Sequence, residues 1–249
     1  MSRPEVSVII STYQDEINEL KESITSVLHQ EKVSQEIILV MVSDDPNTEI
    51  AKAWIPKIND GAQYSKIRLH VCRESEHPGK SPDGSFFQIN AGLKYATKDY
   101  IRWFSGDDIL YPRSTITQIE ALQKSGKKVS YGGYTLLDRD NKVAESIKFF
   151  PYNRLIHQRT NFINDVALFD SSLIKYLPFE FERWGNYAFW HFWLTVFENE
   201  GDQFEYTDQV LWAYRIREKS EHVARLKRPG GKQEYARFRR ALQNNHPIR

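Results

Sequence analysis

Short apolar runs alternate with longer amphipathic segments along the first half of the chain. The runs are bounded by polar residues, as in buried strands, and the second run contains no polar position at all. The segments between them repeat an apolar residue every three or four positions, which indicates helices. Strands are predicted at 6–10, 37–42, 67–72 and 100–104, and helices at 17–28, 50–58 and 86–96. This alternation, at about 30 residues for each strand–helix unit, predicts an α/β fold with an open, mostly parallel, twisted sheet flanked by helices.

The second half of the chain is less regular. Two extended segments at 129–137 and 143–150 flank the turn Asp140-Asn141, which favours antiparallel pairing. An aromatic-rich helix is predicted at 187–198, followed by a strand at 205–216.

No internal repeat or long linker divides the chain. One domain is therefore predicted over 1–221, with a first half at about 1–112 and a second at about 113–221. A break at 228–231 (RPGG) precedes a last predicted helix in the tail at 222–249. The tail carries eight Lys and Arg residues and one acid, whereas the whole chain has a formal net charge of +1. Such a tail fits an anionic partner, such as a membrane surface, or equally a solvated basic helix.

Composition excludes several classes of protein. The single cysteine, Cys72, excludes an intramolecular disulfide. The longest mainly apolar runs, 37–42 and 187–197, fall well short of the roughly 20 residues that a membrane-spanning helix needs. The first residues show no secretory signal pattern. We therefore expect a cytoplasmic protein whose tail could bring it to the inner face of a membrane; nucleic-acid binding would rest on the tail alone and is not expected.

Polar residues gather where the predicted strands end. The first strand is followed by STYQDE (11–16), the second by SDD (43–45) and the fourth by SGDD (105–108). Open parallel sheets bind ligands at the carboxyl ends of their strands, and grouped carboxylates suit Mg²⁺ or Mn²⁺ bridging phosphates. Taken singly, each acidic pair is more typical of a turn or a helix cap, so Asp107-Asp108 would alternatively cap a helix at about 112–123.

Two common phosphate-binding schemes are absent from the sequence. No GxGxxG follows the first strand, and GxxxxGK[ST] does not occur. Because 11–16 contains no glycine, this loop does not wrap a pyrophosphate closely. The phosphates would instead need a metal held by the acidic residues.

Three stretches resemble family 2 glycosyltransferases in order and spacing: VSVIISTYQDE (6–16), EIILVMVSDDPNTE (36–49) and NAGLKYATKDYIRWFSGDD (90–108). The resemblance covers about 4–112 well and 160–220 loosely. It implies the GT-A fold, with a Rossmann-like half that binds a nucleotide-sugar and a second half that binds the acceptor. In this family the polar strand ends hold the nucleoside, and a DxD-type motif after the fourth strand holds a divalent metal.

The resemblance places functional residues position by position. The expected nucleotide-sugar contacts are Ser11, Thr12, Tyr13, Glu16, Asp44, Asp45, Asn90, Ser105, Gly106, Asp107, Arg215 and Arg217. The expected ligands of Mn²⁺ or Mg²⁺ are Asp107, Asp108 and His222. Ser105 stands where DxD has its first acid, so its hydroxyl would bond to the ribose or a metal-bound water while Asp107 binds the metal directly.

The stretch WAYRIREKSEH (212–222) resembles the family's closing strand, where a Tyr-Arg pair and often a His close over the diphosphate. Tyr214 and Arg215 match the pair, and Arg217 stands where the His is often found. A guanidinium there would neutralise the leaving diphosphate. The plain structural alternative is an arginine-rich edge of a surface strand.

The general base is the largest departure from the family. An inverting enzyme needs a base for the acceptor hydroxyl, and the family usually supplies an Asp at the start of a helix. The matching stretch GNYAFWHFWLTV (185–196) has Asn186 there, and asparagine cannot accept the proton. Substitute candidates are Glu180, Glu182 and His191. We rank Glu182 slightly ahead of His191, for which a core or stacking role is the favoured alternative.

The sequence therefore predicts a metal-assisted, inverting glycosyltransferase that moves a sugar from a nucleotide-sugar, preferably UDP-linked. The acceptor would be a glycan or a lipid-linked oligosaccharide in surface polysaccharide assembly. One alternative is a non-catalytic GT-A-like domain that binds nucleotide-sugar or glycan, as Asn186, Ala188 and Ser105 would favour. Another is a nucleotidyltransferase, but that chemistry needs a glycine- and arginine-rich loop after the first strand.

Overall fold

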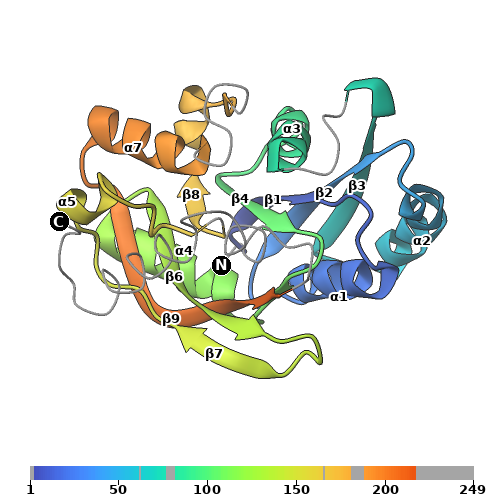
Figure 1. Ribbon diagram of the computed structural model, residues 1–249, viewed down its shortest axis with the longest axis horizontal. Coiled ribbons are helices and arrows are strands. Elements are labelled where there is room, and N and C mark those ends of the chain that lie inside the picture. Colours follow the sequence, from blue (N-terminus) through green and yellow to red (C-terminus); the bar gives the residue numbers. More distant parts are fainter. Residues whose placement is uncertain (1–2, 62, 77–81, 165, 181–187, 217–249) are drawn as a thin grey trace, which may run out of the picture.

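A nine-stranded mixed sheet runs through the described part of the protein (Figure 1). The computed structural model describes residues 3–61, 63–76, 82–164, 166–180 and 188–216. The strands are β1 (Glu5–Ser11), β2 (Ser34–Val42), β3 (Ser65–Cys72), β4 (Tyr100–Ser105), β5 (Ile109–Leu110), β6 (Val129–Leu137), β7 (Val143–Ile147), β8 (Leu168–Asp170) and β9 (Phe204–Arg215). Their order is β3-β2-β1-β4-β8-β6-β9-β5, and β7 pairs with β6.

The first four strands of the sheet are parallel, as the strand–helix alternation predicts. β8 is antiparallel to both β4 and β6 and so joins the two halves. Beyond it, β6 and β9 run parallel to each other, while β5 and β7 are antiparallel to their partners. The expected α/β sheet is therefore confirmed, and so is the antiparallel pairing expected of 129–137 and 143–150, which form the β6–β7 hairpin.

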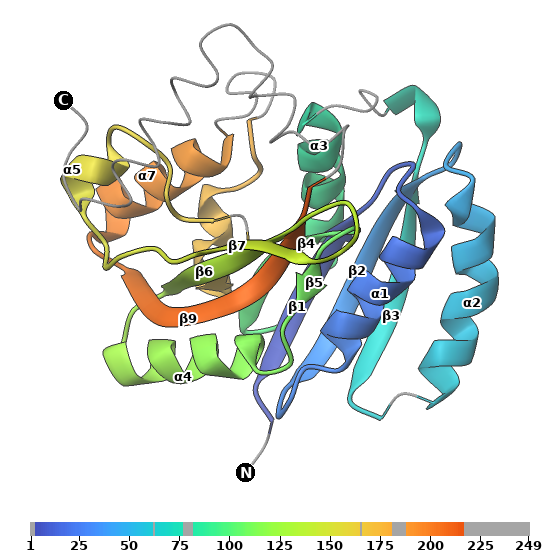
Figure 2. The ribbon, with the colours of Figure 1, turned by 60° about the horizontal axis from the view of Figure 1, so that its bottom comes forward.

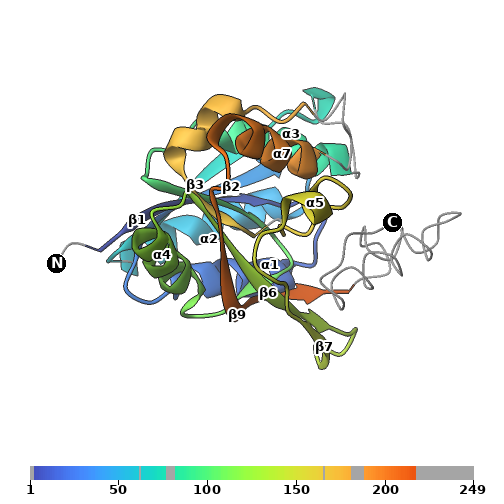
Figure 3. The ribbon, with the colours of Figure 1, turned by 90° about the vertical axis from the view of Figure 1, so that its left-hand side faces the viewer.

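Helices cover both faces of the sheet, as Figures 1 and 3 show. One face carries α3 (Pro82–Leu93), α7 (Ala188–Glu200) and the 3₁₀ helix η2 (Ser171–Tyr176), and the other carries α1 (Ile17–Leu28), α2 (Asn47–Gly61) and α4 (Ser114–Ser125). Two short helices, η1 (Glu74–Glu76) and α5 (Arg154–His157), complete the described elements. No helix in these ranges has the length and apolar composition needed to cross a bilayer.

The alternation of side chains along β1 divides the core into two layers. Ile9 packs toward α3, whereas Val8 and Ile10 pack toward α1, and all three are fully buried. On the α3 side the core is aromatic, because Trp103 of β4 lies 4.9 to 5.8 Å, centroid to centroid, from five aromatic rings. Trp193 of α7 is one of these rings and is itself buried, so it belongs to the core.

Most predicted elements lie where the pattern places them, with shifts at their ends. α3 ends at Leu93 rather than 96, because the N–H groups of Tyr95 and Ala96 bond to Gly92 and Leu93 in a tighter turn. β7 ends at Ile147, three residues before the predicted end. The final helix predicted after 228–231 lies outside the described residues.

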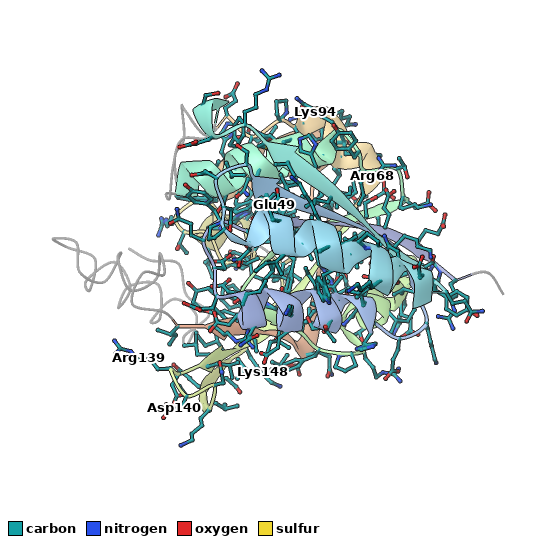
Figure 4. The ribbon with its side chains drawn as sticks, turned by 90° about the vertical axis from the view of Figure 1, so that its right-hand side faces the viewer. Glu49, Arg68, Lys94, Arg139, Asp140 and Lys148 are labelled. Carbon is teal, nitrogen blue, oxygen red and sulfur yellow. The ribbon has the colours of Figure 1, made fainter. Side chains whose placement is uncertain are left out.

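The β6–β7 hairpin extends beyond the sheet (Figure 3). Its turn includes Asn141 with a positive φ of 60°, which agrees with the predicted turn. Charged side chains, among them Arg139, Asp140 and Lys148, gather on this hairpin (Figure 4). Hairpins joined by a residue in the left-handed region are common, and asparagine is one of the few non-glycine residues that adopt it readily.

A buried histidine predicts a pH dependence of stability. His157 is fully buried beside Phe162 and Phe204, with Nδ1 bonded to the Tyr152 hydroxyl at 3.0 Å. Desolvation lowers its pKa from 6.5 to about 3. Between these two values the unfolded chain binds a proton that the folded chain does not, so stability falls as pH decreases. The expected slope is about 1.4 kcal/mol per pH unit from this residue.

The measurement is urea unfolding of wild type and His157→Phe at several values from pH 4.5 to 6.5. Because phenylalanine cannot titrate, the variant should lose less stability on acidification than the wild type does. Equal slopes in the two proteins would show that His157 does not contribute.

Candidate functional site

The polar segments predicted at three strand ends meet at one edge of the sheet. β1 lies between β2 and β4, and Ser11 is in register with both Val40 and Ser105. The N–H of Gly106 donates to the carbonyl of Ser11 at 3.0 Å, and the N–H of Thr12 to that of Val40 at 3.4 Å. The loops after β1, β2 and β4 therefore form one surface, as the parallel order requires.

Gly106 lets two of these loops approach closely. A Cβ at this position would lie 2.7 Å from Cβ and 2.9 Å from Oγ1 of Thr12, and 3.1 Å from Oδ2 of Asp15. Only glycine fits such spacing without displacing the loop after β1. The Thr12 hydroxyl in turn donates to Asp15 at 2.8 Å, so the side chain that Gly106 faces is itself held in place.

The two acids after β2 have different surroundings. Asp45 is 3% exposed, and its carboxylate accepts the N–H of Gln14 at 2.7 Å and the N–H of Asn47, the first residue of α2, at 2.8 Å. These bonds make Asp45 a structural residue that holds the loop after β1. Asp44 is exposed and accepts the Tyr13 hydroxyl at 2.8 Å, a bond that raises the pKa of Tyr13. Of the two, Asp44 is the acid open to a ligand.

A buried glutamine that the sequence pattern does not single out supports the same loops. Gln88 of α3 is 1% exposed, and its Nε2 donates to the carbonyls of Thr12 at 2.7 Å and Val40 at 2.9 Å. The only sequence signal is a polar residue within an apolar helical stretch. Such a residue does not reveal its partners, which lie 48 and 76 positions away along the chain.

The SGDD segment after β4 has one half-buried and one buried carboxylate. The hydroxyl of Ser105 donates to Oδ1 of Asp107 at 2.5 Å. Asp108 is 2% exposed, and its carboxylate accepts the N–H of Arg215 at 3.1 Å. α4 begins at Ser114, and its N-cap Arg113 makes no side-chain cap bond. The alternative in which Asp107 and Asp108 cap this helix is therefore wrong.

The residues of the SGDD segment fit a divalent cation that is held mainly by the phosphates of a bound substrate. In the described ranges, no group of three His, Cys, Asp or Glu residues is arranged to hold a metal ion. Asp107 supplies one carboxylate with partial exposure, whereas Asp108 is directed to Arg215. Mg²⁺ in phosphate-processing sites is commonly held by one or two carboxylates together with substrate phosphates and water. His222, the third expected ligand, lies outside the described residues.

Arg215 is buried and bonds to other parts of the protein, so its contact with a diphosphate stays a prediction. It is 1% exposed, and its guanidinium bonds to the Asp107 carbonyl, to Asn141 and to Glu22. The sequence does not indicate that Asn141 or Glu22 contacts Arg215, since both residues belong to distant segments. Arg217 lies outside the described residues.

The remaining expected contacts and bases lie on separate elements. Glu16 is the exposed N-cap of α1 and makes no side-chain cap bond. Asn90 uses both ends of its amide on the backbone of Phe179, at 2.9 Å each, so its proposed contact with the nucleotide stays a prediction. His191 is half-buried in the first turn of α7, and Glu180 is exposed. Glu182 lies outside the described residues.

Comparison with known proteins gives a consistent family. The family model described as glycosyl transferase family 2 matches residues 7–176. An uncharacterized glycosyltransferase of Rickettsia conorii is 32% identical over 155 residues, which are 60% of this chain and 23% of that relative. The UDP-Glc:alpha-D-GlcNAc-diphosphoundecaprenol beta-1,3-glucosyltransferase WfgD of Escherichia coli is 25% identical over 187 residues, 74% of this chain and 68% of that protein. The chain spans between 19% and 24% of the length of the first three curated relatives.

A solved structure confirms the fold. The mannosyltransferase PcManGT of Pyrobaculum calidifontis, in complex with GDP-Man and Mn²⁺, matches with a TM-score of 0.60 at 17% identity. The match covers 98% of this chain and 66% of that protein. The expected GT-A fold is therefore confirmed. A likeness at this identity bears on the fold alone.

Proposed function

Because the chain belongs to glycosyl transferase family 2, we propose that it transfers a sugar from a UDP-sugar to a glycan or a lipid-linked oligosaccharide. The observation that carries the proposal is the meeting of three polar loops at one edge of the sheet, with Gly106 packed against Thr12. UDP is favoured as the nucleotide because the E. coli relative, by its name, uses UDP-Glc.

The nucleoside would lie against the loops after β1 and β2. Tyr13 and Asp44 are both accessible there, whereas Asp45 and Gln88 are buried and hold the backbone of the loop after β1 through hydrogen bonds. A carboxylate accepts hydrogen bonds from the N–H of a base or the hydroxyls of a ribose. We therefore assign the direct contact to Asp44 and a supporting role to Asp45.

The diphosphate would lie beside SGDD, where Asp107 would hold Mn²⁺ or Mg²⁺ with the donor's own phosphates. Such an ion, when bound, stabilises the negative charge on the departing diphosphate. Ser105 would keep the Asp107 carboxylate in one orientation through the 2.5 Å hydrogen bond. Within this proposal Ser105 supports the metal ligand Asp107 and does not replace the missing first acid of DxD.

The acceptor half would supply the general base for an inverting transfer. Glu182 stays the first candidate and His191 the second. A lipid-linked acceptor is supported by the name of the E. coli relative, which acts on a diphosphoundecaprenol-linked sugar. The basic tail would then contact anionic lipid. Co-sedimentation with anionic vesicles tests this contact, and the absence of binding would contradict it.

A nucleotide-release assay with UDP-, GDP- and dTDP-sugars tests the proposed function. Each donor is assayed with Mn²⁺, with Mg²⁺ and with EDTA. We expect release from a UDP-sugar that requires the metal. Binding by calorimetry without any release, even with lipid-linked acceptors present, would favour the non-catalytic alternative. Failure to bind any of the nucleotides would contradict the proposal.

A further inference from the structure

Arg215 joins four segments that are far apart in the sequence. Its Nη1 donates to the carbonyl oxygen of Asp107 at 2.8 Å, and its Nε to Oδ1 of Asn141 at 3.1 Å. Its Nη2 bonds to the carboxylate of Glu22 on α1. Its own N–H donates to the carboxylate of Asp108 at 3.1 Å. One residue therefore connects β9, α1, the β6–β7 hairpin and the turn that carries Asp107.

The curvature of β9 brings Arg215 to this place. Figure 2 shows β9 following β6 and ending beside β5, and the pairing of Ile109 with Ala213 fixes that end. Arg215 follows two residues later and is 1% exposed, so its cation is removed from water. A buried guanidinium is tolerated only when its donors are paired, and here each of its three nitrogens has a partner.

We propose that Arg215 is a positioning residue that sets the metal affinity of Asp107 by fixing the Asp107-Asp108 turn. This inference rests on the proposed function, because it concerns the metal that Asp107 would hold. Arg215 holds the backbone of Asp107 while Ser105 holds its carboxylate. Glu22 orients the guanidinium from α1, so a helix outside the strand-end loops contributes to the geometry of the metal ligand.

The alternative is that Arg215 contacts the diphosphate directly. Burial and the inward hydrogen bonds oppose it, because the guanidinium would have to leave Asp107, Asn141 and Glu22 to reach a ligand. The two roles predict opposite effects for Glu22→Gln. If Glu22 orients a positioning residue, its loss weakens metal binding. If Glu22 competes with the diphosphate for the cation, its loss strengthens donor binding.

The experiment measures Mn²⁺ binding to the full chain with UDP present, by electron paramagnetic resonance of free Mn²⁺, and UDP binding without metal by calorimetry. We expect Glu22→Gln to weaken Mn²⁺ binding about tenfold, the scale of one lost charge-assisted hydrogen bond. UDP binding without metal should stay within about twofold of wild type, because the nucleoside loops are unaffected.

A second variant, Arg215→Lys, separates charge from geometry. Lysine keeps the positive charge but cannot bond to three partners in a planar arrangement. We expect it to weaken Mn²⁺ binding by about tenfold or more. The matched control is Glu31→Gln, which removes another exposed glutamate that pairs with an arginine, Arg113 at 3.7 Å. This control should bind Mn²⁺ as wild type does.

Three outcomes overturn the assignment. Tighter UDP binding in Glu22→Gln would assign Arg215 to the diphosphate. Wild-type Mn²⁺ binding in Glu22→Gln would show that the orientation of Arg215 does not matter, even if Arg215→Lys failed to fold. A wild-type protein that binds neither Mn²⁺ nor UDP would overturn the proposed function and this assignment with it. The first two outcomes leave the proposed function intact, so the two failures are distinguishable.

Discussion

Asp107→Asn is expected to lower metal-dependent nucleotide release by about 100-fold or more, the largest effect predicted for this protein. Asp107 carries the only partly exposed carboxylate of SGDD, because Asp108 is buried against Arg215. An asparagine has nearly the same shape and still accepts the Ser105 hydroxyl, but it lacks the charge that holds Mn²⁺ or Mg²⁺. The loss should therefore be one of metal binding with little change in stability.

The measurement is release from the best donor as a function of Mn²⁺ concentration, with thermal unfolding recorded alongside. Asp60→Asn serves as the control, since Asp60 is an exposed aspartate of α2 far along the chain from SGDD. It should keep wild-type release at every Mn²⁺ concentration. Full activity in Asp107→Asn would show that the metal, if used, is held elsewhere, and would contradict the role assigned to SGDD.

Gly106→Ala is expected to weaken donor binding by about ten- to 100-fold, because misplacement of about 1 Å in a binding site costs affinity on this scale. The added methyl would lie 2.7 Å from Cβ of Thr12, so the loops after β1 and β4 must separate. Thr12 also bonds to Asp15 and Gln88, so a displacement of Thr12 would disturb both of these hydrogen bonds. The cost in stability should be about 1–3 kcal/mol, the usual range for overpacking.

Calorimetric titration of UDP into the variant measures this effect. The matched control is Gly61→Ala, because a Cβ at Gly61, the last residue of α2, meets no atom within 4 Å. Alanine there should leave UDP binding unchanged and alter stability by about 1 kcal/mol or less. Equal UDP affinity in Gly106→Ala and wild type would mean that the contact between the two loops does not shape the donor site.

The parallel strands of the first half could be predicted because they depend on local patterns. An all-apolar segment such as 37–42 is stable only when both faces are covered, and helices of regular period between such segments force parallel crossovers. The meeting of 11–16, 43–45 and 105–108 follows directly from that order. The path of β9 does not, because a strand that returns to pair with both β6 and β5 depends on contacts between residues far apart in the chain.

Roles within the site were harder to predict than its location. Asp44 and Asp45 are chemically identical neighbours, yet one is exposed and the other accepts two backbone N–H groups. Arg215 was expected at the diphosphate on the strength of its charge and its place in the closing strand. The structure pairs it with Glu22 and Asn141, which no local pattern connects with it.

From the sequence alone, the parallel strands of the first half, the edge at which the polar loops meet and the family could be predicted. Periodicity and motif spacing are local properties of the sequence. The hydrophobic effect buries the apolar face of a strand or helix in the same way wherever that segment lies in the fold. The three-dimensional fold was needed to show which carboxylate is open to a ligand, which one supports a loop, and that Arg215 is buried. Burial and pairing depend on neighbours brought together from distant segments, and these determine whether a polar side chain holds the fold or faces a ligand.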